Sequence, residues 1–317
     1  MQPVSATELR GTWGTLLLPL EPDDSIGWSR LAGEIDCLIA AGVDGIYSNG
    51  TAGEFYAQSE PEFDRIHHLL AEKCARAAMP WQAGASHTSP QETLDRIRRV
   101  KPLRPGAIQV ILPDWFPLTN EEAVRFLDRV AAESSPIPLV LYNPPHAKRE
   151  LTPADFGALA RAVPALVGVK VAHSSSEWCA AFRRECPGLA LFVPGHDLAT
   201  GFSHGAHGSY SNVACLSPAG AVRWFRQMRS DLGSALELET RVRQFLSNHI
   251  LPFRRDHGIS NQGLDKLLAA IGGWAHVGTR LRWPYSFIPE DAALRLRPVA
   301  RELLPELFQG LPDCPVK

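Results

Sequence analysis

The stretch "TPADFGALARAVPALVGVKVAHSSSE" (residues 152–177) contains one complete structural unit and decides the fold. It opens on Thr152 with a carboxylate three positions later, which is the pattern of a helix N-cap, and Pro153 suits the first helical turn. A short apolar run at 166–172, of the kind found in a buried strand, follows. A second cap at 174–177 begins another helix. The stretch therefore predicts a helix, a strand and the start of the next helix.

The same unit recurs along the chain at a spacing of roughly 30 residues, the usual length of a strand plus its helix. Further helix caps begin at Ser59, Ser89 and Thr119. The apolar strand-like runs lie at 11–20, 45–50, 81–85, 107–113, 138–145, 166–172, 189–195 and 208–216. A regular strand-and-helix period predicts parallel strands with both sheet faces covered. Eight such units predict a (β/α)8 TIM barrel, with a doubly wound open sheet as the alternative.

The pattern changes after Gly233. Three helical segments, at 234–258, 262–273 and 292–308, follow one another with no strand between them. We therefore predict a barrel domain over residues 1–233 and a C-terminal helical extension over residues 234–317 that packs on it.

The composition is that of an ordinary soluble enzyme, with 45% hydrophobic residues, 21% charged residues and a net charge of -2. This charge gives no reason to expect nucleic acid or a membrane as a partner. No apolar run is long enough to span a bilayer, and the first residues lack the pattern of a signal peptide. A cytoplasmic location is predicted, because scattered cysteines without a C-x-x-C motif suit reduced thiols. These are Cys37, Cys74, Cys179, Cys186, Cys215 and Cys314.

Lys170 is the first candidate for chemistry, because it lies within an apolar strand between Val169 and Val171. Burial, which we expect these valines to provide, lowers the pKa of a lysine and makes its neutral amine available to attack a carbonyl. The alternative is a lysine on an edge strand or one that extends to the rim. Tyr142 ends the preceding strand, where a phenol beside an amine can transfer protons. Its alternative role is to pack the top of the barrel.

The loop "NGTAGEF" (49–55) presents a Thr51 hydroxyl and backbone N–H groups, which suit a carboxylate, although a plain glycine-rich turn is the alternative. His204, His207 and the His196-Asp197 pair raise the possibility of a metal site. The sequence nevertheless lacks an H-E-x-x-H motif and a carboxylate-rich series at the strand ends, so we predict no metal. It also lacks G-x-G-x-x-G and a phosphate-binding loop, so we predict no nucleotide cofactor.

Three motifs together resemble the dihydrodipicolinate synthase / N-acetylneuraminate lyase family of Schiff-base aldolases: "GTAGE" (50–54), "LYNPP" (141–145) and "GVKVA" (168–172). Their order and spacing agree with the family, and the resemblance extends over most of the chain, including the helical C-terminal part. It implies a lyase in which Lys170 forms an imine with pyruvate or another 2-oxo acid while Tyr142 transfers protons. It also implies that no metal or organic cofactor is needed, and that the protein is a homo-oligomer, a dimer or tetramer.

The resemblance further implies that Thr51 and the N–H groups of Ala52 and Gly53 hold the substrate carboxylate. Ala52 itself replaces a second threonine of the family's loop. Ala147 aligns with an arginine of the synthases, which is therefore missing unless Lys148 or Arg149 takes its place. Trp115 stands where the synthases carry a tyrosine that reaches into a neighbouring subunit and relays protons.

These departures favour an aldolase or dehydratase acting on a hydroxylated 2-oxo acid. The alternatives are 4-hydroxy-tetrahydrodipicolinate synthase itself, a catalytically impaired paralogue that binds 2-oxo acids, and a metal-dependent barrel aldolase. Among the strand-end residues we expect Trp115, His146, His196 and Tyr210 to bind substrate. The wider polar set from which the distal end of the substrate could be bound is His87, Asp114, His146, His173, His196, Asp197, Tyr210 and Asn212.

Overall fold

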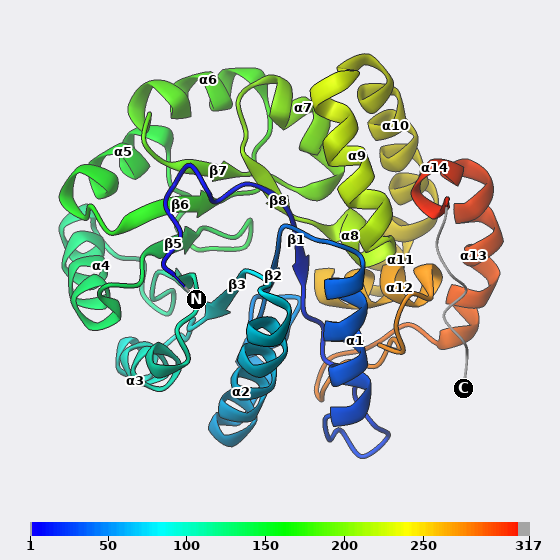
Figure 1. Ribbon diagram of the computed structural model, residues 1–317, viewed down its shortest axis with the longest axis horizontal. Coiled ribbons are helices and arrows are strands. Elements are labelled where there is room, and N and C mark those ends of the chain that lie inside the picture. Colours follow the sequence, from blue (N-terminus) through cyan, green and yellow to red (C-terminus); the bar gives the residue numbers. More distant parts are fainter. Residues whose placement is uncertain (1, 310–317) are drawn as a thin grey trace.

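Eight strands pair in chain order into a closed parallel barrel in the computed structural model, which describes residues 2–309 (Figure 1). The strands are β1 (Gly11–Thr15), β2 (Gly45–Tyr47), β3 (Trp81–Gly84), β4 (Ala107–Ile111), β5 (Leu139–Tyr142), β6 (Leu166–Lys170), β7 (Ala190–Phe192) and β8 (Gly208–Tyr210). Each lies within one of the eight predicted runs, so the TIM-barrel prediction is confirmed. Cys314 and the last part of the predicted extension lie outside the described residues.

Helices alternate with the strands and surround the barrel (Figure 1). The main ones are α1 (Trp28–Ala40), α2 (Glu60–Ala77), α3 (Pro90–Val100), α4 (Asn120–Ser134), α5 (Pro153–Ala162), α6 (Ser176–Glu185), α7 (Leu198–Ser203) and α9 (Pro218–Ser230). The predicted caps are in place, because Ser59, Thr119 and Thr152 each form a capping box. Ser89 and Ser175 each accept a hydrogen bond from the first turn of the helix that follows.

The strands are shorter than the predicted apolar runs, most of all β1 and β8. β1 ends at Thr15 although its apolar run continues to residue 20, and β8 ends at Tyr210 although strand was expected to 216. Residues 212–216 instead form a short helix, α8 (Asn212–Leu216), whose N-cap Ser211 accepts a hydrogen bond from the Ala214 N–H. A short apolar run fits a buried strand and a buried helix equally well, which is why periodicity alone gave the wrong element.

The C-terminal part of the described chain is helical, as predicted. It comprises α10 (Leu232–Phe245), a π-helical turn η4 (Leu246–Ile250), α11 (Leu251–His257), α12 (Asn261–Gly272), α13 (Glu290–Leu303) and α14 (Pro305–Phe308). The boundary predicted after Gly233 falls in the first turn of α10. α12 packs against α8, immediately beyond the carboxyl end of β8, while α13 and α14 lie at the outer edge of the molecule (Figure 1). The extension therefore reaches the end of the barrel where active sites of this architecture lie.

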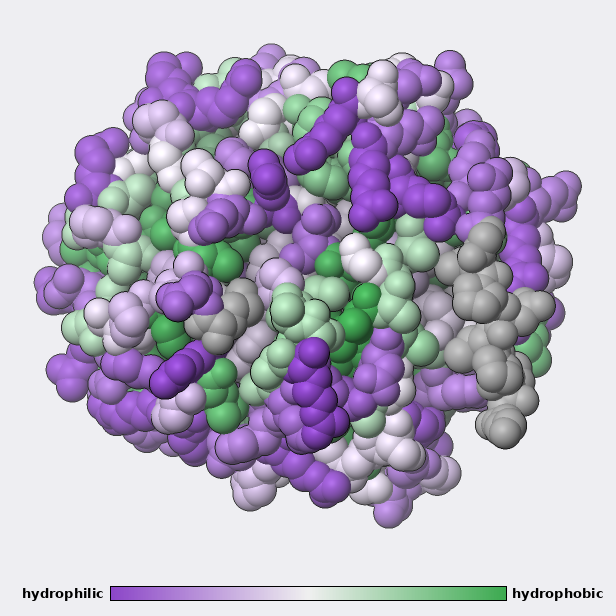
Figure 2. Space-filling view, in the orientation of Figure 1, coloured by the Kyte–Doolittle hydropathy of each residue, from purple (hydrophilic) through white to green (hydrophobic). Residues whose placement is uncertain are grey.

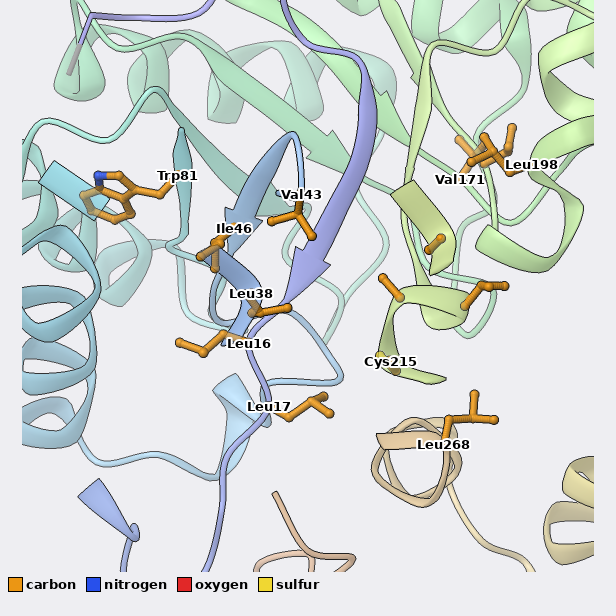
Figure 3. Close-up of a cluster of buried hydrophobic side chains, with 14 of the residues drawn as sticks. Leu16, Leu17, Leu38, Val43, Ile46, Trp81, Val171, Leu198, Cys215 and Leu268 are labelled. Atoms are coloured by element: carbon orange, nitrogen blue, oxygen red, sulfur yellow. The ribbon is translucent and has the colours of Figure 1, made fainter. Parts of the chain in front are cut away.

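Alternation along each strand divides the apolar residues into two layers. One cluster fills the lumen and includes Trp13, Tyr47 and Tyr210, whereas the larger one lies between strands and helices and contains Val169 and Val171 (Figure 3 shows Val171). On the face drawn in Figure 2, hydrophilic residues dominate the periphery. Within residues 2–309 no helix has both the length and the apolar character required to cross a membrane.

Candidate active site

Lys170 is the last residue of β6 and its amine points into the barrel lumen. Its Nζ lies 4.1 Å from the centroid of the Tyr142 ring, 5.2 Å from that of Tyr47 and 5.5 Å from that of Tyr210. Burial lowers the pKa of the amine to about 8, against an opposing effect of the nearby Asp265 charge. Three phenol rings therefore desolvate the amine. The expectation that the flanking valines do so was wrong, because successive side chains of a strand point to opposite faces.

Tyr142 is the last residue of β5 and pairs directly with Lys170 in the sheet register. Burial raises the pKa of the Tyr142 phenol to about 12, partly offset by a hydrogen bond with the Thr51 side chain. The phenol consequently stays protonated at neutral pH and can give or relay a proton. Amine, phenol and hydroxyl thus form a connected group contributed by β6, β5 and the loop after β2.

The loop after β2 carries the predicted carboxylate cradle. The backbone N–H groups of Ala52 and Gly53 donate no hydrogen bond to any residue between 2 and 309. Gly53 is buried, and an added Cβ would come within 3.1 Å of the Leu16 carbonyl oxygen. At Gly50 an added Cβ would overlap the Tyr47 hydroxyl, so only glycine fits there without rearrangement. The loop leaves two N–H groups unused beside the Thr51 hydroxyl.

A buried ion pair ties this loop to the C-terminal extension. Lys266 of α12 lies 2.5 Å from a carboxylate oxygen of Glu54, and their side chains are 0% and 1% exposed. The Lys266 ammonium also donates to the Arg280 carbonyl at 2.6 Å, while the second Glu54 oxygen accepts from the Arg282 N–H at 3.0 Å. Glu54 has a positive φ of 52°, which this network helps to hold. Sequence reasoning missed Lys266 as a second buried lysine.

Most of the predicted site residues meet in one cavity of about 500 Å³ at the carboxyl end of the strands. Seven of the nine line it: Thr51, Ala52, Tyr142, His146, Lys170, His196 and Tyr210. Gly53 lines neither this cavity nor its neighbour. A neighbouring cavity of about 610 Å³ shares Thr51, Tyr142 and His146 with it. The Lys170 amine therefore faces a space large enough for a small polar molecule.

The wider polar set divides between the two cavities. Asp197 and Asn212 line the cavity that contains Lys170, and Asp114 lines its neighbour. His87 and His173 line neither: the His87 ring accepts from the Ser89 N–H, and His173 contacts the Glu150 carboxylate at 2.5 Å. Among residues 2–309 no three His, Cys, Asp or Glu side chains come together as metal ligands would.

Trp115 lies apart from the other predicted residues. Its side chain is 82% exposed and lines neither cavity, and Phe116 beside it is 79% exposed. The Lys148 ammonium lies 5.1 Å from the Trp115 ring centroid and donates to the Trp115 carbonyl at 2.8 Å. Within a single chain, this tryptophan therefore does not reach Lys170.

The extension supplies groups that sequence reasoning did not single out. Asp265 and Gln262 of α12 line the cavity of Lys170. Cys215 of α8, which precedes the extension, also lines it and lies near Leu268 of α12 (Figure 3). Burial raises the pKa of the Asp265 carboxyl to about 6, against the opposing charge of Lys170. The available signal was two adjacent charges, Asp265 and Lys266, in the otherwise apolar segment 262–273.

The sequence is similar to those of known proteins along most of its length. Residues 8–296 match the profile of the dihydrodipicolinate synthetase family. A 4-hydroxy-tetrahydrodipicolinate synthase of Methylococcus capsulatus (strain Bath) is 31% identical over 213 residues, which cover 66% of this chain and 72% of that protein. An N-acetylneuraminate lyase of Escherichia coli O1:K1 is 26% identical over 241 residues, covering 74% of this chain and 80% of the lyase.

Solved structures share the fold. YagE, a prophage protein of the dihydrodipicolinic acid synthase family from E. coli K12 solved in complex with pyruvate, superposes with a TM-score of 0.82 at 22% identity, covering 93% of this chain and 98% of YagE. The N-acetylneuraminate lyase of Fusobacterium nucleatum superposes with a TM-score of 0.80 at 18% identity, covering 94% of this chain and 99% of that one.

Proposed function

Because the chain belongs to the dihydrodipicolinate synthetase family and is a lyase of the class I aldolase type, we propose that it acts on 2-oxo acids through an imine at Lys170. The observation that carries the proposal is the lysine itself. Its amine lies in a ligand-sized cavity, beside a phenol, with a pKa lowered by burial to about 8. At pH 7 such a group is about one-tenth neutral, several hundred-fold more than an ordinary lysine.

The first step is attack of the neutral Lys170 amine on the C2 carbonyl of the substrate. The carbinolamine that forms loses its hydroxyl as water, with a proton supplied by Tyr142, whose ring lies 4.1 Å from the amine. The resulting iminium withdraws electrons from C3, so that a carbanion there is stabilised as an enamine. Carbon–carbon bonds at C3 can then form or break.

The substrate carboxylate binds in the loop after β2. The unused N–H groups of Ala52 and Gly53 and the Thr51 hydroxyl provide three donors for it. The hydroxyl that Ala52 lacks is not required for this, because the backbone donors remain. Holding the carboxylate there directs C2 toward Lys170.

A hydroxylated 2-oxo acid fits the rest of the cavity. His146 and His196 offer polar groups beyond the amine, and such groups favour a substrate that can pair with them. Tyr210 lines the cavity with its ring, because its hydroxyl donates to the Gln82 side chain at 2.8 Å. The alternative, 4-hydroxy-tetrahydrodipicolinate synthase activity, has support in the Methylococcus relative. Against it, Arg149 is not free to replace the synthase arginine that aligns with Ala147. Its guanidinium already donates to the Leu118 carbonyl and the Asp155 carboxylate.

We also propose that the protein is a homo-oligomer, a dimer or tetramer. The adjacent exposed rings of Trp115 and Phe116, next to the cavity loops, are suited to contact a second copy, and Trp115 would meet substrate only there. A cytoplasmic location agrees with the free thiols of Cys74, Cys179, Cys186 and Cys215.

Borohydride reduction tests the proposal. Protein incubated with pyruvate and reduced should gain the mass of one reduced pyruvyl group, and Lys170→Ala should gain none. Lys73→Ala, which removes a lysine from the surface ion pair with Asp36, should gain it as the wild type does. No adduct, together with a lyase activity that EDTA abolishes, would favour the metal-dependent alternative. An adduct without turnover of any hydroxylated 2-oxo acid would favour the impaired paralogue.

A further inference from the structure

Asp265 lies on the face of α12 that closes the cavity of Lys170. Asn261, Asp265 and Leu268 all line that cavity, and their spacing of four and three residues puts them on one side of the helix. The next residue, Lys266, points elsewhere and pairs with Glu54. The carboxylate is therefore presented to the cavity by a rigid element that packs against α8.

The Asp265 carboxylate is unpaired, unlike other carboxylates nearby. It forms no hydrogen bond or ion pair within 4 Å with any residue of the described chain. Asp197, in the same cavity, pairs with Arg243 and accepts from Ser174 at 2.9 Å. Because no described residue supplies a donor, the Asp265 carboxylate is free to accept a proton or a hydrogen bond from a molecule in the cavity.

We propose that Asp265 exchanges a proton with the hydroxyl on C4 of an imine-bound 4-hydroxy-2-oxo acid. The proposal rests on the proposed imine at Lys170. It divides the proton transfers between two groups: Tyr142, in register with Lys170 and hydrogen-bonded to Thr51, acts at the imine, and Asp265 acts at the far side of the reacting bond.

In the cleavage direction Asp265 begins as a carboxylate and accepts the proton of the C4 hydroxyl. The oxygen lone pair forms the C4 carbonyl, and the C3–C4 bond breaks. Its electron pair forms the C2–C3 double bond of the enamine, while the iminium nitrogen accepts the displaced pair. The products are an aldehyde and an enamine on Lys170, which takes a proton at C3 and is hydrolysed to the 2-oxo acid and free amine. In the synthetic direction, protonated Asp265 returns its proton to the C4 alkoxide.

The ionisation of Asp265 suits this role. Burial raises the pKa of the carboxyl to about 6, so that near neutral pH it is mostly a base and yet binds a proton readily. The titratable groups that share its cavity are Lys170, Tyr142, Tyr210, Cys215, His146 and His196. The other charged groups there are Asp197, Arg243 and Arg254. Once the Lys170 amine has become an iminium, its positive charge lies beside Asp265 and favours the carboxylate form that accepts the C4 hydroxyl proton.

The test compares Asp265→Asn with the wild type in three assays. Pyruvate trapping by borohydride should persist at a rate no lower than that of the wild type, because loss of the Asp265 charge lowers the pKa of Lys170 further. Exchange of the pyruvate methyl protons for deuterium in D₂O should persist too, since neither reaction involves a C4 hydroxyl. Cleavage of 4-hydroxy-2-oxoglutarate and of 2-oxo-3-deoxy sugar acids should fall by about 10²–10⁴-fold in kcat, the usual loss for an acid–base group. In the wild type, kcat should fall on the acid side of its pH profile as Asp265 becomes protonated. This fall should be absent from the variant.

Asp291→Asn, which removes an exposed carboxylate of α13, is the matched control and should behave as the wild type. Asp265→Ser replaces Asp265→Asn if the amide variant does not fold. Cleavage at the wild-type rate would overturn the proposal, and so would a parallel loss of methyl-proton exchange. If the wild type itself traps no pyruvate, the imine proposal fails instead.

Discussion

Breaking the buried ion pair between Lys266 and Glu54 should destabilise the protein strongly. In Lys266→Met the Glu54 carboxylate stays buried, with the Arg282 N–H at 3.0 Å as its remaining hydrogen-bond donor among the described residues. Removal of one partner from a buried pair costs about 3–5 kcal/mol, which for a chain of this size lowers the Tm by roughly 6–10 °C. Calorimetry or circular dichroism at a fixed scan rate measures the change.

A double-mutant cycle isolates the pair from other effects of the substitution. Adding Glu54→Gln to Lys266→Met removes the uncompensated charge while keeping an acceptor for Arg282, so much of the lost stability should return. The control is Lys73→Met, which breaks a solvent-exposed pair with Asp36 at 2.7 Å and should cost about 1 kcal/mol or less. Equal losses in Lys266→Met and Lys73→Met, or no recovery in the double variant, would refute the reasoning.

Three further predictions concern the site. Because burial lowers the pKa of Lys170 to about 8, the rate of pyruvate trapping should rise as the pH increases through about 8; a midpoint near 10.5 would contradict this desolvation. Tyr142→Phe should lower turnover by about 10²–10⁴-fold, and an unchanged rate would show that protons travel by another route. Gly50→Ala should lose about 1–3 kcal/mol of stability from overlap with the Tyr47 hydroxyl, and Tyr47→Phe should restore part of it; Tm values with no such recovery would count against the overlap.

The barrel could be predicted from the sequence because its signals are local. Helix caps such as Thr152 and the apolar runs before them depend on neighbours a few residues away, and those elements formed as expected. Residues 212–216 were misassigned because a five-residue apolar run carries no period that separates strand from helix. These residues form the helix α8, and α8 packs against α12.

The candidate site was predictable only in part. Lys170, Tyr142 and Thr51 lie at strand ends, so an eight-unit barrel brings them together whatever the extension does. Asp265 and Lys266 reach the site because α12 packs across the carboxyl end of the barrel, a tertiary contact that periodicity cannot predict. The environment of Lys170 was misassigned for a related reason: the rings around its amine come from other strands, not from its sequence neighbours.

The most direct measurement identifies which lysine carries the reduced pyruvate adduct. Within residues 2–309, two buried or partly buried lysines lie near the cavity. Lys266 is occupied by Glu54 and the Arg280 carbonyl, whereas Lys170 has no hydrogen-bond partner in the same range. Protein trapped with pyruvate and borohydride should therefore yield, after proteolysis and tandem mass spectrometry, a single modified peptide with the label on Lys170. A label on Lys266 or on any other lysine, with Lys170 unmodified, would contradict the account.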